Sequence, residues 1–586
     1  RDYAFWTDHS GNNNDFQHVN LEHSDVVLDR PTNNFATLNP LNNDSMTLSE
    51  GNLAGISPAN AHNAVGSTFS VTGGKWYWEV MSDGTGSNYF FGMGRSSFQF
   101  ISQYTNDAHN FSDLWAVATD GTKSNGSGET SYGSALASGD VLMLAFDLDN
   151  GKFYAGKNGT FYGSGDPAAG TNAAFTNVPT DEPMTAFYAS STSGLNHIFN
   201  FGQDSSFAGN VIAGGNSDAN GNGDFKYAPP SGFLALCTDN LPDPGINPNA
   251  DESPADYFNT VLYTGNQSVR TITGVGFQPD WIWAKRRSTT AESHILVDSV
   301  RGATITNKAN SLNANGTNAN GITGFDADGF DLGTSTEPNT NSATYVAWNW
   351  LAGGAASSNG NGTITSNVSA SPRSGFSIVS YTGTGSNATV GHGLTAAPDF
   401  VWIKNRDASS NQYIYTTPGG AGKQLTFEDN GSGSASGFVT TSNKMTDVPS
   451  STVLNLATSS AVNGNTNAML AYCFHNVEGY SKVGTYEGNG NANGAFVHTG
   501  FRPAWVLFKR VDATSAWVIL DNKRDVDNPV EHILFNTSAK ELSPFDRCDF
   551  LSNGFKLRDT GSGVNNADTI LYLAFAEQPF KYANAR

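Results

Sequence analysis

Short hydrophobic runs separated by Gly, Asn, Ser and Thr recur along the whole chain, for example VLMLAFDLD at 141–149 and DWIWAKRR at 280–287. Aromatic residues make up 12% of the chain and glycine contributes 64 residues, whereas runs of Lys, Glu or Leu are few. Aromatic and β-branched residues favour strands, and Gly and Asn favour the turns between them. The pattern predicts an almost entirely β structure.

One hydrophobic phrase occurs three times, as GFQPDWIWAKRR at 276–287, AAPDFVWIKNR at 396–406 and FRPAWVLFKR at 501–510. Its lysines, Lys285, Lys404 and Lys509, are 119 and 105 residues apart. That period is far longer than a solenoid repeat and fits tandem domains of about a hundred residues, each with its own core.

The surroundings of the phrase also repeat. A Tyr-x-Gly stretch precedes each copy, at Tyr263, Tyr381 and Tyr486. A short Gly-Phe strand follows each copy, near Phe330, Phe438 and Phe555. Each unit then closes on an apolar strand, as in TYVAWNWLAGG, AMLAYCFHNVEG and ILYLAFAEQPF.

The phrase itself has the pattern of a strand that is covered on both faces, because its apolar run is continuous. Trp281 and Trp283 are then core residues, and the alternative is a platform on which a sugar ring stacks. The lysine after the run is expected to mark the exit of the strand to solvent.

The predicted organisation has six parts. Residues 1–25 end a preceding segment, 26–245 form a β-sandwich, and 254–353, 374–478 and 479–586 are the three sandwich-like repeats. Residues 354–373 form a Gly/Ser/Asn-rich linker, which we expect to be flexible. The second and third repeats follow each other almost without a gap, which predicts a fixed relative orientation.

Two Asn-Gly pairs, Asn150-Gly151 and Asn158-Gly159, lie between strand-like runs. Asn-Gly is a strong hairpin signal because a type I′ turn needs positive φ at both central residues. The segments VLMLAFDLD, KFYAGK and TFYG are therefore expected to form a three-stranded meander.

Together with GKWYWEV at 74–80, FNFGQ at 199–203 and the Pro-Pro-Ser-Gly-Phe segment, this meander resembles the SPRY domain over about residues 46–240. The resemblance implies a concanavalin-like β-sandwich that acts as a binding module. The stretch VLDRPTNNFATLNPL at 27–41 and the three repeats resemble structural proteins of tailed phages from marine bacteria. That resemblance implies a protein at the surface of a phage particle.

Charge limits the partners. The chain has 53 acidic and 31 basic residues and a formal net charge of −22, which argues against binding to nucleic acid or to an anionic membrane surface. No apolar run approaches the roughly 20 residues of a membrane span. Cys237, Cys473 and Cys548 are too far apart and too few for a disulfide framework, and we expect each to be a small buried hydrophobe.

The search for chemistry found no motif of a zinc protease, a serine hydrolase or a P-loop, so we expect no enzymatic activity and no cofactor. One loop, NSDANGNGDF, resembles a calcium loop through Asp218, Asn220, Asn222 and Asp224. Its twelfth position is Pro229, where calcium loops carry a bidentate Glu. The alternative is a turn-rich loop that leads into the last strand of the sandwich.

Four residues in sandwich loops are candidates for ligand binding: Tyr104, His109, Phe161 and Tyr162. Rigid β-sandwiches present such loops for recognition. We expect a tail-fibre or receptor-binding adhesin for a host-surface glycan, a homo-oligomer with a trimer favoured, in contact with other virion proteins. The alternatives are a head decoration, a head fibre or a structural tail component, and, less favoured, a glycan-depolymerising spike.

Overall fold

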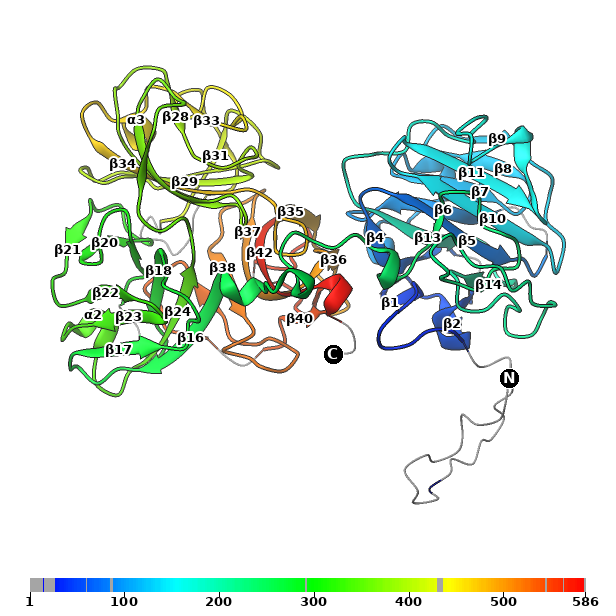
Figure 1. Ribbon diagram of the computed structural model, residues 1–586, viewed down its shortest axis with the longest axis horizontal. Coiled ribbons are helices and arrows are strands. Elements are labelled where there is room, and N and C mark those ends of the chain that lie inside the picture. Colours follow the sequence, from blue (N-terminus) through cyan, green and yellow to red (C-terminus); the bar gives the residue numbers. More distant parts are fainter. Residues whose placement is uncertain are drawn as a thin grey trace. The chain divides into compact units, whose positions relative to one another are not determined.

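The structure is a computed structural model that describes residue 14 and residues 27–58, 61–84, 88–289, 292–428, 436–542, 545–561 and 563–583. It is almost entirely β, as predicted, and divides into a first unit, Arg1–Leu241, and a second unit, Pro242–Arg586 (Figure 1). The predicted segment 1–25 lies outside the described residues, apart from residue 14. Among the described residues, no helix has the length and apolar character needed to cross a membrane.

The first unit is a sandwich of two mainly antiparallel sheets. The first sheet contains, in spatial order, β1 (Leu38–Asn43), β4 (Asn63–Val71), β13 (Met184–Ser190), β6 (Tyr89–Arg95), β7 (Leu114–Ala118), β8 (Thr122–Ser124) and β9 (Glu129–Ser131). The second contains β12 (Thr160–Phe161), β11 (Lys152–Lys157), β10 (Val141–Asp147), β5 (Lys75–Met81), β14 (Asn196–Asn200), β3 (Ala54–Ile56) and β2 (Thr47–Ser49), with β15 (Leu234–Ala235) parallel to β5. Short helices complete the unit: α1 (Phe100–Gln103), η3 (Glu50–Asn52), η4 (Ala108–Asn110), η5 (Tyr162–Ser164) and η6 (Thr238–Asn240).

The predicted meander is confirmed, with β10 paired to β11 and β11 to β12. At the second hairpin Asn158 and Gly159 both have positive φ, 48° and 86°, as a type I′ turn requires. The first hairpin differs, because Asp147 pairs with Lys152 across a longer loop. There the Asp147 carboxylate accepts the N–H of Asn150 at 3.1 Å, and only Gly151 has positive φ.

The second unit contains three sandwich-like repeats, each with one large and one small sheet. In the first repeat the large sheet is β16 (Phe258–Thr264), β24 (Thr344–Trp350), β18 (Trp281–Arg286), β19 (Ile295–Asp298), β20 (Ile305–Lys308) and β21 (Gly316–Thr317), and the small one is β17 (Arg270–Thr273), β23 (Gly329–Leu332) and β22 (Ile322–Asp326). In the third repeat the large sheet is β35 (Ser481–Glu487), β42 (Thr569–Pro579), β37 (Phe501–Arg510), β38 (Trp517–Asp521) and β39 (Leu534–Phe535), and the small one is β36 (Phe496–His498), β41 (Gly554–Leu557) and β40 (Cys548–Leu551).

The second repeat has the longest sheet of the unit. It contains β25 (Ser357–Asn359), β26 (Ser366–Ser371), β27 (Phe376–Thr382), β34 (Ala468–Phe474), β29 (Phe400–Asn405), β30 (Tyr413–Thr416), β31 (Lys423–Thr426) and β32 (Val439–Thr440). Its small sheet pairs β28 (Ala388–Gly391) with β33 (Val453–Leu456). The short helices of the unit are η7 (Pro248–Ala250), η8 (Pro254–Asp256), α2 (Thr336–Asn339), α3 (Ser460–Asn463) and η9 (Phe580–Tyr582).

Residues of the repeated phrase alternate between two cores, because successive side chains of a strand point to opposite faces of the sheet. Ile282 and Ala284 of β18 belong to a core within the first repeat. Trp281 and Trp283 belong instead to a core that all three repeats share, and each is at most 2% exposed. The tryptophans are therefore core residues, as predicted. Each repeat has a core of its own, and the shared core is an addition that the sequence analysis did not predict, since one face of each large sheet packs against the other repeats.

The shared core has a cyclic pattern of hydrogen bonds. In each repeat the strand that carries the repeated phrase pairs with the strand that follows it, β19, β30 or β38. The residue at or just before the start of that following strand is His294, Gln412 or Trp517, and its side chain reaches a backbone carbonyl of another repeat. His294 lies 2.7 Å from the oxygen of Phe535, Gln412 donates to that of Lys308 at 2.9 Å, and Trp517 donates to that of Thr426 at 2.8 Å. The three acceptors occupy equivalent positions in their sheets. The repeats thus close into a ring with approximate threefold symmetry.

A second cyclic contact is present at two of the three interfaces. The Tyr472 hydroxyl donates to Asp298 at 2.8 Å, and the Trp348 indole donates to Asp521 at 3.0 Å. At the equivalent positions of the third interface, strand register places Leu573, which has no donor, and Thr416, which has no carboxylate. Donor and acceptor are thus both replaced at the same interface.

The lysines of the phrase do not lead out to solvent. Lys285, Lys404 and Lys509 are at most 1% exposed. The Lys285 ammonium donates to the carbonyl of Glu292, that of Lys404 to the carbonyls of Leu312 and Ser410, and that of Lys509 to the carbonyl of Ser515. A carbonyl oxygen from the following loop thus satisfies each ammonium, joined for Lys404 by the Leu312 carbonyl of the first repeat, which is why a charged residue can lie inside the fold. Burial lowers the pKa of Lys285 and Lys404 to about 8 and that of Lys509 to about 7.

Two predictions about the second repeat are also wrong. The expected linker 354–373 contains β25 and β26, which extend the large sheet by pairing β26 with β27 from Ser371↔Phe376 to Asn367↔Ser380. Phe438 is not the counterpart of Phe330, because the segment around it forms β32 at the edge of the large sheet. The strand equivalent to β23 is β33, in which Leu454 is buried.

The Tyr-x-Gly stretches close each repeat against a buried asparagine. The hydroxyls of Tyr263, Tyr381 and Tyr486 donate to the carbonyls of Pro338, Val462 and Val564. The next residue after each carbonyl is Asn339, Asn463 or Asn565, whose side chains accept and donate backbone hydrogen bonds in the loop that follows the tyrosine. The glycine is required by space, since a Cβ on Gly265 would lie 2.2 Å from the oxygen of Thr340.

Candidate binding sites

The loop with calcium-like spacing is a hydrogen-bonded turn. One carboxylate oxygen of Asp218 accepts the N–H groups of Asn220 and Asn222, both at 2.9 Å. The other accepts the N–H of Ala235 and the side-chain amide of Asn240. Asp224 accepts from Ser205 and Gly215. The Asp218 carboxylate therefore organises this loop against β15, and among the described residues no group of three or more His, Cys, Asp or Glu side chains has a metal-binding arrangement.

Two of the predicted ligand-binding residues have mainly structural surroundings. Tyr104 is 2% exposed and packs with Phe98 and Phe100 in a core cluster of the first sheet, so it is not available to a ligand. His109 is half-buried, and its Nδ1 lies 3.4 Å from the Oε1 of Glu129. Glu129 begins β9, which is the edge strand of its sheet.

The other two predicted residues lie at one margin of the sandwich, which we call the aromatic edge and define as Tyr132, Phe161 and Tyr162. All three are half-buried. Tyr132 follows β9, and Phe161 and Tyr162 come from β12 and η5, so the edge strands of the two sheets meet here. The rings of Tyr132 and Tyr162 are 5.7 Å apart and nearly perpendicular, at 79°.

The aromatic edge is held rigidly. The Tyr162 hydroxyl donates to the carbonyl of Ser134 at 2.9 Å, and the Lys123 ammonium lies 5.0 Å from the centre of the Tyr132 ring. Partial burial raises the pKa of both tyrosines to about 12. Both hydroxyls therefore keep their proton at neutral pH.

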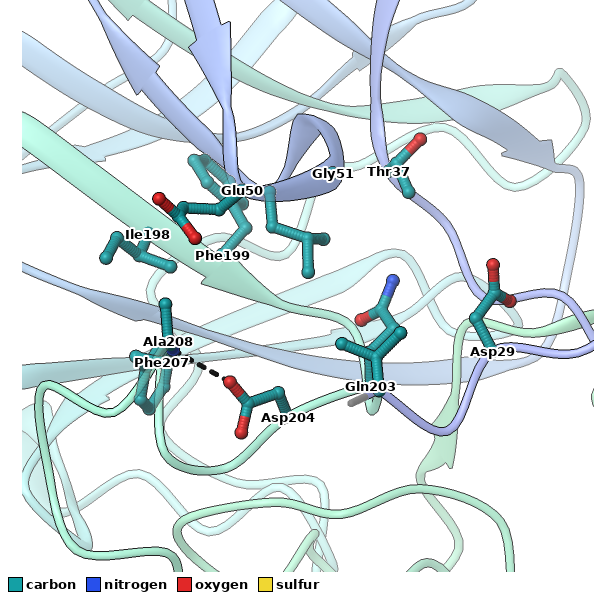
Figure 2. Close-up of a pocket in the computed structure, with 12 residues that line it drawn as sticks. Asp29, Thr37, Glu50, Gly51, Ile198, Phe199, Gln203, Asp204, Phe207 and Ala208 are labelled. Atoms are coloured by element: carbon teal, nitrogen blue, oxygen red, sulfur yellow. Dashed lines mark hydrogen bonds between the residues drawn. The ribbon is translucent and has the colours of Figure 1, made fainter. Parts of the chain in front are cut away.

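A pocket of about 230 Å³ lies elsewhere on the first unit (Figure 2). Its apolar lining consists of Val27, Leu53, Ile198, Phe199, Phe207 and Ala208. Its polar lining consists of Asp29, Thr37, Glu50, Gln203 and Asp204. Figure 2 shows Glu50 and Asp204 on one side of Gln203 and Asp29 on the other.

The acidic groups of the pocket differ in how far their oxygens are used. Asp204 accepts from the N–H and hydroxyl of Ser206 and from the N–H of Ala208, the last at 2.7 Å. Asp29 accepts the N–H of Phe35 at 2.8 Å. Glu50 is exposed, and its carboxylate makes no hydrogen bond or ion pair with the described residues. The surrounding walls desolvate Asp29 and raise its pKa.

Backbone conformation around the pocket is unusual. Glu50, Phe207 and Ala208 have φ of 51°, 51° and 56°. The left-handed region is uncommon for residues other than Gly, and a bulky residue there is an outlier. The hydrogen bond from Ala208 to Asp204 and the burial of the Phe207 ring hold this turn in place. Such conformations persist only where the surroundings determine them.

The pocket was missed in the sequence because its residues come from three distant segments, around 27–37, 50–53 and 198–208. Asp29 lies in the stretch 27–41, which the phage resemblance singled out, but nothing there indicates a partner in the segment SSFAGN at 205–210. Two residues of the aromatic edge, Phe161 and Tyr162, were predicted because they follow a recognisable hairpin. Tyr132 was not, because it follows an exposed strand with no apolar pattern.

Comparison with known proteins assigns both units. Residues 75–204 match the SPRY domain, so the first unit is a SPRY sandwich, as predicted. The chain is similar to the SPRY domain of human HERC1 (15% identity, 28% of this chain and 96% of that one, TM-score 0.23). It is also similar to the TRIM65 PSpry domain (12% identity, 28% and 89%, TM-score 0.22) and to stonustoxin (18% identity, 28% and 27%, TM-score 0.21).

No curated protein matches the chain. Residues 253–579, which are more than half of the chain and include all three repeats, match the family described as "Domain of unknown function (DUF7483)". The cyclic hydrogen bonds, the buried lysines and, apart from Ile246, the shared core all lie within these residues. The chain therefore belongs to the DUF7483 family and carries a SPRY domain before the family's own region.

Proposed function

We propose that this chain is a structural protein of a tailed-phage virion that acts as a tail-fibre or receptor-binding adhesin for a host-surface glycan. The observation that carries the binding role is the aromatic edge of the SPRY sandwich. The placement in a virion is supported by the resemblance of residues 27–41 and of the three repeats to phage structural proteins.

The aromatic edge has the composition of a sugar-binding surface. The rings offer apolar faces on which a sugar ring can stack, while the hydroxyl of Tyr162 is engaged with the carbonyl of Ser134. Exposed polar residues of β9, Glu129, Thr130 and Ser131, lie beside them. The nearly perpendicular contact between the Tyr132 and Tyr162 rings fixes both rings before a ligand arrives, which limits the conformational entropy lost on binding.

Two measurements test this proposal. Gold-labelled antibody against the chain should mark the tail tip or the projecting fibres of intact virions in electron micrographs. On a host-glycan array, Tyr162→Ala should reduce binding at least tenfold. Tyr162→Phe, which keeps the ring and loses only the hydrogen bond to Ser134, should retain most of it. Equal binding by all three proteins would contradict a site at this edge.

A second role, as a head decoration or other structural component, is favoured by exposed apolar side chains of the third repeat. Val526 is 77% exposed and Phe545 is 65% exposed, and contacts with other virion proteins would cover such groups. Antibody label over the head or along the tail shaft would support this role instead. Light scattering of the purified chain would show whether it forms the proposed homotrimer.

A further inference from the structure

We propose that the pocket of the first unit binds the side chain of a lysine presented by a partner protein. This site is separate from the aromatic edge, so the proposal goes beyond glycan binding. Three features of the pocket support a lysine: its size, the division of its lining into apolar and acidic parts, and the carboxylate oxygens that still have a free lone pair.

The size of the pocket selects a single side chain. Its volume of about 230 Å³ is below the range of about 300–1,000 Å³ that small-molecule pockets occupy. The apolar part, formed by Leu53, Ile198, Phe199 and Phe207, provides a surface for an alkyl chain. A lysine side chain has four methylene groups, and such stems are buried along apolar surface while the charged end stays near polar groups.

Apart from the hydroxyl of Thr37, the polar part of the pocket offers acceptors rather than donors. The side-chain amide of Gln203 already donates to the carbonyl of Ala36, and its oxygen already accepts from Phe201. In Figure 2 Glu50 and Asp204 both lie to one side of Gln203, Glu50 above and Asp204 below, and both are carboxylic side chains. The lining contains no lysine or arginine among the described residues that could neutralise them. A ligand that brings several N–H donors and a positive charge complements this arrangement.

Lysine fits this arrangement better than arginine. A guanidinium presents a planar fork that suits a carboxylate with both oxygens free. Asp204 has both oxygens engaged by Ser206 and Ala208, and Asp29 has one engaged by Phe35. Only Glu50 has both oxygens free, so a planar fork could pair with one carboxylate of the three. An ammonium has three donors that can point in separate directions, each toward one remaining lone pair. The acidic groups of the pocket are therefore suited to a compact charge.

The test uses the whole chain and two blocked tripeptides, acetyl-Gly-Lys-Gly-amide and the same peptide with norleucine, which keeps the alkyl chain and lacks the charge. Methyl NMR spectra during a titration to millimolar concentrations should show shifts at Ile198 and Leu53 with the lysine peptide. The norleucine peptide should bind at least tenfold more weakly, and so should the arginine peptide.

Glu50→Gln is the informative variant, because Glu50 is exposed and its removal leaves the internal hydrogen bonds of the pocket intact. It should weaken binding of the lysine peptide about tenfold and reduce the salt dependence. Asp181→Asn removes an exposed carboxylate of the same unit outside the pocket lining and should change neither. Equal affinity for the lysine and norleucine peptides, no effect of Glu50→Gln, or shifts that avoid Ile198 and Leu53 would each overturn the proposal. None of these outcomes alters the glycan or virion experiments.

Discussion

At the scale of single residues, the second unit contains an arginine with no contact with water. The Arg524 side chain is 0% exposed and binds Asp521 at 2.6 Å and Glu541 at 3.1 Å. Asp521 also accepts the indole N–H of Trp348 from the first repeat. A buried charge without its partner costs far more than an exposed one. The pair therefore contributes to holding two repeats together.

Asp521→Asn should lower the free energy of unfolding by about 1–3 kcal/mol, because it weakens the buried pair and the bond from Trp348 but leaves Arg524 its second carboxylate, Glu541. Urea denaturation followed by tryptophan fluorescence measures this change. The control is Glu252→Gln, which removes the partner of Arg373, whose side chain is 46% exposed. An exposed pair is worth at most about 1 kcal/mol. Similar small losses in both variants would show that Arg524 is not buried as described.

The buried lysines predict a dependence of stability on pH. In the folded state the pKa of Lys509 is about 7 because burial disfavours its charge, whereas an unfolded lysine has a pKa of about 10.4. Between these values the unfolded chain binds more protons than the folded one, so the free energy of unfolding rises with pH. This contribution is lost as the pH falls toward 7.

Urea midpoints measured from pH 7 to pH 9 should therefore increase, and Lys509→Met should flatten the increase. Lys523→Met removes an exposed lysine of the same repeat and serves as the control. Above pH 10 the ionisation of unfolded tyrosines would add an opposing effect, so the comparison stays below it. A wild-type midpoint that falls across this range would contradict a buried, neutralised lysine.

At the scale of elements, the small sheets depend on glycines that allow close strand approach. Gly329 has a φ of 150°, and a Cβ there would lie 1.9 Å from the backbone oxygen of Ile272 in the paired strand β17. Gly329→Ala should therefore cost about 1–3 kcal/mol, as for other forced backbone strain. Gly360→Ala meets nothing within 4 Å and should stay within about 0.5 kcal/mol. Thermal unfolding of the two variants measures the difference, and equal stability would contradict the close approach.

The sequence predicts elements well where burial and turn chemistry act locally, as in the β10–β11–β12 meander and the phrase strands. Prediction from the sequence fails where residues far apart in the chain determine the structure of a segment. The linker 354–373 has a flexible composition, yet β26 gains order by adding to an existing strand, β27. Phe438 matched the Gly-Phe pattern, but the equivalent core position is Leu454, which no local pattern distinguishes. The pocket combines residues 29, 50 and 204, whose proximity only the folded chain provides.

At the scale of the whole molecule, the DUF7483 unit behaves as one folded body rather than three. Each large sheet gives one face to its own small sheet and the other to the common core. The three contacts made by His294, Gln412 and Trp517 have different chemistry but the same acceptor position. Approximate threefold symmetry has thus been kept although the side chains differ. The common role of the three contacts is to hold each repeat against the next and so close the ring.

A cavity in the core that belongs to one repeat alone should therefore destabilise all three repeats. Leu520 is fully buried in the core of the third repeat, outside the shared core, and Leu520→Ala should cost about 2–5 kcal/mol. In hydrogen exchange at moderate urea, strands β18, β29 and β37 should all lose protection together, because unfolding of the third repeat exposes one side of the shared core. Val526→Ala, at a side chain of the same repeat that is 77% exposed, should leave all three unchanged. Loss of protection confined to β37 and its neighbours would mean that the repeats unfold separately, and the shared core would then be a contact surface between independent domains.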